Sequence, residues 1–260
     1  MSQAELLASL PEKHRRHLDP ASSSQVRMMA ARGMVPLPPR DLIVVLVGLA
    51  LDDNAELAAS ASASLDRLPD NIIGPVLEGV LPAVALGVLV EHLAGREELI
   101  EKLVLNRGTP DNAIASIAAD VTEGIAEIIA NDQERCLRSQ PLVEEVRKNP
   151  NLPRAVLDRL FDFLVRSGVI HEDMAEFGQA VSRLGPQDME QVVDEIELPD
   201  IVGDFTAEVP GPSPAAVETE ERIPATKLLA QLTGAQKVAM AFRGNKEIRN
   251  ILIRDTNRVV

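Results

Sequence analysis

Apolar residues recur through the middle of the chain at the spacing of helices that bury one face. Leu57, Ala61, Leu65 and Leu68 form a typical set, three or four positions apart, within residues 55–68. Segments of two to five residues, rich in Pro, Gly, Asn and Asp, separate such runs. Connections this short make successive helices antiparallel neighbours. Because no stretch alternates in the manner of β-strands, the pattern predicts an all-α fold.

The periodicity predicts eleven helices in the middle of the chain. They span residues 41–50, 55–68, 71–79, 83–94, 96–105, 110–119, 122–131, 140–148, 153–166, 172–183 and 187–196. Residues 1–34 are expected to form one or two further short helices around Pro11 and Pro20.

Two stretches are strongly apolar, Leu42–Leu51 and Gly79–Val90. Their ten and twelve uncharged residues fall short of the roughly 20 that a membrane-spanning helix needs, so we interpret them as buried core helices. The N-terminus lacks the pattern of a signal peptide, and the single cysteine, Cys136, cannot form an internal disulfide. We therefore expect a soluble, cytoplasmic protein.

A weak internal repeat relates residues 105–118 to residues 148–161. The matched pairs, each 43 positions apart, are Asn106 with Asn149, Pro110 with Pro153 and Ile114 with Leu157. In both copies an Asn-containing turn ends one helix, and a Pro in the first turn opens the next, where its missing N–H costs little. A period of about 40–47 residues is typical of HEAT and armadillo arrays.

The segment Asp52-Asp53-Asn54-Ala55-Glu56-Leu57, with Ala61 and Leu65 after it, resembles the second helix of a HEAT-like repeat. The Arg that this family usually places after the first apolar position is replaced here by Ala58. The turns at Asn106 and Asn149 are similar to leucine-rich-repeat variant units. The resemblance covers about residues 40–165 and implies a binding scaffold. A non-repetitive, irregular helical bundle stays open as the alternative.

These patterns divide the chain into four parts. An N-terminal helical extension covers residues 1–34, a short helical-repeat domain 35–197, a Pro-rich acidic linker 198–224, and a basic amphipathic helical segment 225–260. The linker has little apolar periodicity to offset its ordering entropy, so we expect it to be disordered. The alternative is an ordered arm anchored by Ile201, Val202 and Phe205.

Composition changes the picture in two ways. Aromatic residues make up 2% of the 260 residues, with five Phe and neither Trp nor Tyr, which argues against sheets and against platforms that stack bases. The formal net charge is −14, and residues 41–200 carry 12 basic and 30 acidic side chains. This acidic middle should repel nucleic acid and anionic lipid, so we expect contact with neither.

Candidate catalytic and metal-binding residues are few. His14 and His17 are spaced to share a helix face, but three neighbouring cations would oppose a metal, so we interpret them as a solvated basic turn. Two flanking arginines could lower the pKa of the Cys136 thiol, yet its apolar neighbour favours plain packing. The acidic run over 188–200 lacks the pattern of a calcium loop, and no phosphate-binding glycine motif occurs. We predict no enzyme, metal or cofactor, the alternative being an enzyme with an unrecognised helical active site.

The basic segment 225–260 is the candidate binding element. We expect helices over Lys227–Leu232 and Ala235–Arg243, then a last helix capped by Asn245, in which Ile248, Ile251 and Leu252 share one face. Its candidate partner-binding residues are Arg243, Lys246, Arg249, Arg254 and Arg258. They could form an ordinary polar face, pair with the acidic middle of this chain or of a second copy, or dock on an acidic partner. Contact with nucleic acid or an anionic membrane is a further alternative. We predict a protein–protein interaction scaffold or adaptor with this segment as a tethered docking element.

Overall fold

The computed structural model describes residues 2–171, 174–196, 198–199, 225–244 and 246–253. Every element within these ranges is a helix, which confirms the all-α prediction. In chain order they are α1 (Ser2–Ser9), α2 (Glu12–Arg15), α3 (Ser24–Ala31), α4 (Pro39–Ala50), α5 (Ala55–Asp66), α6 (Asp70–Leu77), α7 (Ala83–His92), α8 (Glu97–Leu105), α9 (Asp111–Ala118), α10 (Glu123–Asn131), α11 (Gln133–Arg138), α12 (Gln140–Val146), α13 (Arg154–Arg166), α14 (Ala175–Arg183), α15 (Pro186–Glu195), α17 (Ala225–Leu229), α18 (Gly234–Arg243) and α19 (Lys246–Leu252).

The predicted helices of the middle of the chain match α4 to α10 and α12 to α15, with ends that differ by three residues or fewer. Two differences remain. Residues 1–34 form three helices, one more than expected, and the six-residue helix α11 was not predicted. Apart from Leu198 and Pro199, the predicted linker lies outside the described residues, as do Asn245, Arg254 and Arg258.

Contacts between helices divide the chain into two compact units. Unit 1 comprises Met1–Arg135 with Pro141–Leu152, and unit 2 comprises Cys136–Gln140 with Pro153–Val260. The predicted domain boundaries lie after residues 34, 197 and 224. They describe parts that fold independently, whereas these units are defined by contacts, so the boundaries stay a prediction.

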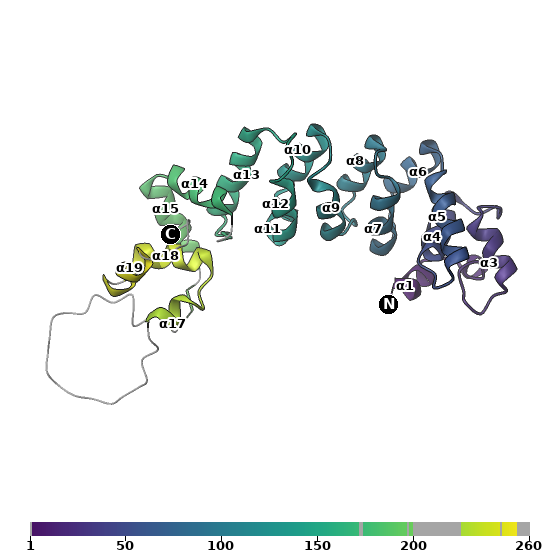
Figure 1. The fold of residues 1–260 in the computed structure, drawn as a ribbon, viewed down its shortest axis with the longest axis horizontal. Coiled ribbons are helices and arrows are strands. Elements are labelled where there is room, and N and C mark those ends of the chain that lie inside the picture. The colour runs from purple at the N-terminus through teal and green to yellow at the C-terminus, as the bar shows by residue number, and fades with distance from the viewer. Residues whose placement is uncertain (1, 172–173, 197, 200–224, 245, 254–260) are drawn as a thin grey trace, which may run out of the picture. The chain divides into compact units, whose positions relative to one another are not determined.

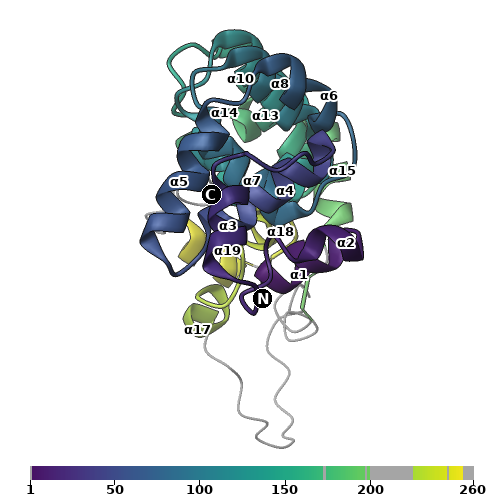
Figure 2. The same ribbon diagram turned by 90° about the vertical axis from the view of Figure 1, so that its right-hand side faces the viewer.

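Helices of unit 1 stack in two rows. Helix α8 packs against α6 and α10, while α7 packs against α4 and α9, and Figure 1 shows these two rows side by side. In the view of Figure 2, α6, α8 and α10 lie one behind another above α7 and α4. Helices α4, α6, α7 and α8 therefore each contact a helix two or three places further along the chain, which is compatible with a helical-repeat array.

The buried faces explain the stacking. In α8 and α10 the buried residues fall at positions i, i+1, i+4 and i+5, so each helix buries one stripe. Helix α4 is buried on all sides from Ile43 to Leu49, as predicted for the first apolar stretch, although Leu51 at its end is exposed. The aromatic residues all follow residue 160, so unit 1 is packed by aliphatic side chains alone.

The second apolar stretch, Gly79–Val90, is only partly buried. Its helix α7 begins at Ala83, and Leu86 and Leu89 are in the core. Val80 instead lies in the preceding turn with 87% of its surface exposed, so the prediction of one buried helix is wrong there. Among the described residues, no helix is both long and apolar enough to cross a membrane.

Unit 2 contains the aromatic core. Phe161 of α13 and Phe177 of α14 are fully buried and meet edge to face, with ring centroids 4.7 Å apart. Helix α18 packs against α15 and α19. The cluster that holds the C-terminal helices together consists of Leu228, Leu229, Leu232, Met240, Ile248 and Leu252, which confirms the predicted apolar face of the last helix.

The N-terminal helices belong to unit 1, where α1 packs against α4 and α7. His14 Nδ1 lies 2.7 Å from Asp41 Oδ2 of α4, and both side chains are almost buried. His17 is only 4% exposed. The interpretation of these histidines as a solvated turn is therefore wrong, because α4 covers a segment whose neighbouring charges suggested exposure.

Candidate functional site

The turns between helices are joined to one another by asparagine side chains. Asn106 Nδ2 donates to the carbonyls of Leu77 and Gly79, at 2.5 and 3.1 Å. Its Oδ1 accepts the N–H of Gly108 at 2.9 Å, which is an Asx turn. The side chain thus shapes its own turn and satisfies carbonyls at the end of α6, the helix two places earlier.

Asn149 repeats this arrangement. Its Nδ2 donates to the carbonyls of Ala118 and Val121, at 2.8 and 2.9 Å, and its Oδ1 accepts the N–H of Asn151 at 2.8 Å. The carbonyls lie at the end of α9 and in the turn after it. The sequence repeat that pairs Asn106 with Asn149 therefore has a structural basis.

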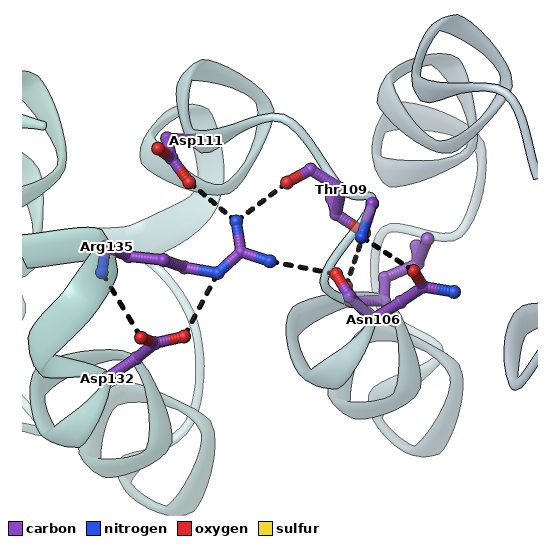
Figure 3. Close-up of polar contacts among 7 residues, drawn as sticks. Asn106, Thr109, Asp111, Asp132 and Arg135 are labelled. Carbon is purple, nitrogen blue, oxygen red and sulfur yellow. Dashed lines mark hydrogen bonds and ion pairs between the residues drawn. The ribbon is translucent and has the colours of Figure 1, made fainter. Parts of the chain in front are cut away.

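The side chain of Arg135 makes the next connection between turns (Figure 3). Its Nη1 donates to the carbonyl of Thr109 at 2.7 Å and to Asp111 Oδ1 at 2.6 Å, and its Nη2 donates to the carbonyl of Asn106 at 2.8 Å. Asp132 accepts from Nε at 3.1 Å. Arg135 is buried, and four of its guanidinium N–H groups donate to these acceptors, so it joins the start of α11 to the turn between α8 and α9.

Arg96 makes the same kind of contact at the turn between α5 and α6. Its Nη2 donates to the carbonyl of Leu68 at 2.6 Å and forms an ion pair with Asp70. In both cases the acceptors flank a proline, in Leu68-Pro69-Asp70 and Thr109-Pro110-Asp111. Sequence reasoning missed these arginines. The available signal is a Pro-Asp pair followed by Arg 26 or 24 residues after the Asp.

Turns fixed in this way line two hollows along one edge of unit 1. A hollow of about 660 Å³ lies between the turns at residues 77–81 and 105–108. A second, of about 440 Å³, lies between Pro38–Arg40 and one side of α6 with the turn after it. Both are lined by Gly79 and Val80, so they meet at this turn. We call the two hollows together the Val80 surface.

The Val80 surface has an apolar centre and a charged rim. Besides Val80, Leu105 is exposed over 59% of its surface. The first hollow is also lined by Glu78, Glu101, Lys102 and Arg107, of which Glu78 and Lys102 pair with each other. An apolar centre within a polar rim is the arrangement of many protein interfaces.

A further hollow of about 310 Å³ lies between the α7–α8 turn and the α9–α10 turn. Alternate turns of an antiparallel array lie at opposite ends of its helices, so this hollow is on the other edge of unit 1 from the Val80 surface. Isoleucines of three helices line it, together with the carboxylates of Glu97 and Asp120. We call it the Glu97 hollow.

Of the predicted partner-binding residues, Arg243 and Arg249 have described side chains, and both are exposed. Arg243 forms an ion pair with Asp194 of α15, so it links helices within unit 2. Lys246 is the first residue of α19. Arg254 and Arg258 lie outside the described residues. Phe242, beside Arg243, is 54% exposed.

The titratable side chains form structural pairs. His92 Nδ1 lies 2.7 Å from Asp66 Oδ1 and joins α7 to α5, as His14 and Asp41 join α2 to α4. Burial, and then the positive charges of Arg16 and His14, lower the pKa of His17. Cys136 is fully buried. In the described ranges, no group of three or more His, Cys, Asp or Glu residues is placed to hold a metal ion.

No family model matches this chain, and neither a curated protein nor a solved structure does. The HEAT-like identity expected from residues 40–165 is therefore a proposal rather than a finding.

Proposed function

We propose that this protein is a non-enzymatic scaffold built on HEAT-like repeats, and that it binds a protein partner at the Val80 surface. Support for the architecture comes from the two rows of helices in unit 1 and from the equivalent turns at Asn106 and Asn149. The observation that carries the function is the exposure of Val80 and Leu105 around hollows that meet at one turn.

The physical reason is the cost of this exposure in water. A fully buried valine or leucine gains about 1.5–3 kcal/mol relative to an exposed one. The chain leaves both side chains exposed beside hollows large enough to receive side chains of a partner. The turns around them are held in place by Asn106 and Arg135, so the surface is preformed. Binding would therefore cost little conformational entropy in these turns.

The C-terminal helices are proposed as a second, tethered docking element. Phe242 and Arg249 are exposed there, which combines an apolar anchor with a cation. Arg243 already forms an ion pair with Asp194 inside unit 2. Of the two candidate arginines whose side chains are described, we therefore propose Arg249 as the one that contacts a partner.

The test is site-specific photo-cross-linking from position 80 in cells, followed by binding assays with the purified cross-linked partner. Val80→Asp and Leu105→Asp should each weaken binding at least tenfold, because a charge placed in an apolar contact loses its hydration. Leu51→Asp is the matched control, since Leu51 is an exposed leucine of unit 1 that lines neither hollow. Undiminished binding by the Val80 and Leu105 variants would refute the proposal.

A further inference from the structure

The Glu97 hollow combines an aliphatic floor with an acidic rim. Ile100 of α8 and Ile125 of α10 are buried at its base, and Ile117 of α9 and Val121 are half-buried along its sides. A floor of this kind accepts an unbranched aliphatic chain, because apolar surface on both sides is removed from water.

Two exposed carboxylates stand at the rim, Glu97 and Asp120. No lysine, arginine or histidine lines this hollow, although the first hollow of the Val80 surface includes both Lys102 and Arg107. The surrounding segment is itself acidic, with 17 acidic and five basic side chains over residues 41–135. The local potential therefore attracts a cation and repels an anion.

The side chain of Thr122 orients Glu97 at the rim of the hollow. Thr122 is the N-cap residue of α10, but its side chain makes no capping hydrogen bond. Its hydroxyl instead donates to Glu97 Oε1 at 2.5 Å. An N-cap bond typically contributes about 1 kcal/mol to helix stability, so the chain gives up a local gain to orient one carboxylate at the rim of the hollow.

We propose that the Glu97 hollow binds a long basic side chain, lysine or arginine, of a protein partner. The aliphatic stem lies on the isoleucine floor, and the cationic head lies between Glu97 and Asp120, where charge-assisted hydrogen bonds form. The assignment of this side chain to a protein rests on the proposed scaffold function. The preference of the hollow for a cation with an aliphatic stem is independent of that function, and it can be measured on this protein without a partner.

The first experiment uses the full-length protein with ¹³C-labelled isoleucine methyl groups and n-butylammonium, the side-chain analogue of lysine. We expect saturable shifts of the Ile100, Ile117 and Ile125 methyl signals, with a dissociation constant of about 1–10 mM for so small a probe. Neutral 1-butanol and anionic butyrate should bind at least tenfold more weakly. Equal binding of 1-butanol, or no shift of these methyl groups with n-butylammonium, would overturn the proposal.

Matched variants separate the hollow from the general negative field. The double variant Glu97→Gln, Asp120→Asn should lose the preference for n-butylammonium. The double variant Glu91→Gln, Glu98→Gln removes the same charge from exposed positions outside the hollow and should keep the preference. If both variants lose it equally, the selectivity belongs to the field and the proposed site is wrong.

A third arm tests the protein source of the ligand. The peptide acetyl-Ala-Ala-Lys-Ala-Ala-amide should shift the same methyl groups, whereas its ε-acetyl-lysine form should not, because acetylation removes the charge. Spermidine binding much more tightly than the peptide would point to a free polyamine and overturn the assignment to a protein. The Val80→Asp variant should respond to n-butylammonium as the wild type does, so failure at the Val80 surface is distinguishable from failure here.

Discussion

Asn106 and Asn149, 43 positions apart in the sequence, make three equivalent hydrogen bonds in two turns of unit 1. Each donates to the carbonyl at the end of an earlier helix and to a carbonyl in the turn after it, and accepts once from the N–H two residues further along. An amide side chain is suited to this position because it supplies donors and an acceptor at one point.

Replacing Asn149 should cost more stability than replacing Asn106. Asn149 is 5% exposed and Asn106 is half-buried, so the carbonyls left unpaired by Asn149→Ala have less access to water. We expect Asn149→Ala to lower the free energy of unfolding by about 1–3 kcal/mol, measured by urea denaturation. Asn112→Ala, at an exposed position of α9, serves as the control. An Asn149 variant as stable as that control would contradict the role described above.

Arg135 should tolerate no substitution, including lysine. Its planar group donates to two carbonyls and two carboxylates at once, and a lysine ammonium cannot reproduce that fork. Removing one partner of a buried charge network typically costs about 3–5 kcal/mol, so Arg135→Ala and Arg135→Lys should both lower the urea midpoint strongly. Arg107→Ala changes an exposed arginine in the same edge and should have little effect. Rescue of stability by lysine would show that charge alone matters.

Acidification should weaken the N-terminal packing through His17. Its pKa in the folded protein lies below the ordinary value of 6.5, so the unfolded chain takes up the proton first as pH falls. The contribution to stability is therefore complete above about pH 6.5 and is lost as pH falls from that value through the lower pKa of His17 in the folded protein. Comparing urea midpoints at pH 7.5 and 5.5 should show a fall for the wild type and a smaller fall for His17→Gln. His92→Gln, which leaves His17 in place, should still lose stability on acidification; equal falls in all three proteins would exclude His17 as the cause.

Gly244 should resist even the smallest side chain. A Cβ built there would lie 2.3 Å from the carbonyl oxygen of Met240 and 2.9 Å from Ile248 Cγ2. Its φ of −66° is open to any residue, so the constraint is space rather than backbone conformation. We expect Gly244→Ala to destabilise the C-terminal helices by about 1–3 kcal/mol, seen as faster hydrogen exchange in α18 and α19.

Gly124→Ala is the control for that substitution. A Cβ at Gly124 meets nothing within 4 Å, and alanine is the better helix former, so stability should rise by up to about 1 kcal/mol. Unchanged exchange in α18 and α19 of the Gly244 variant would show that the helix end shifts without loss.

Local sequence determined most of the helices and some of the turns. The cap of α5 is an example: Asn54 Oδ1 accepts the N–H groups of Glu56 and Leu57 at 3.0 and 3.3 Å, and asparagine is a favoured residue at that position. Such contacts span two or three residues, so their signal lies in a short segment. Helix α11 was missed because its six residues carry too little periodicity to be recognised.

The sequence by itself determined the all-α class, the position of each long helix and the equivalence of Asn106 with Asn149, because spacing and turn chemistry are local. Only the tertiary structure decided that Val80 is exposed inside an apolar stretch, that His17 is buried among cations, and that Glu97 and Asp120 share one hollow. Burial and proximity of this kind depend on which distant segments pack together. No local pattern records that pairing.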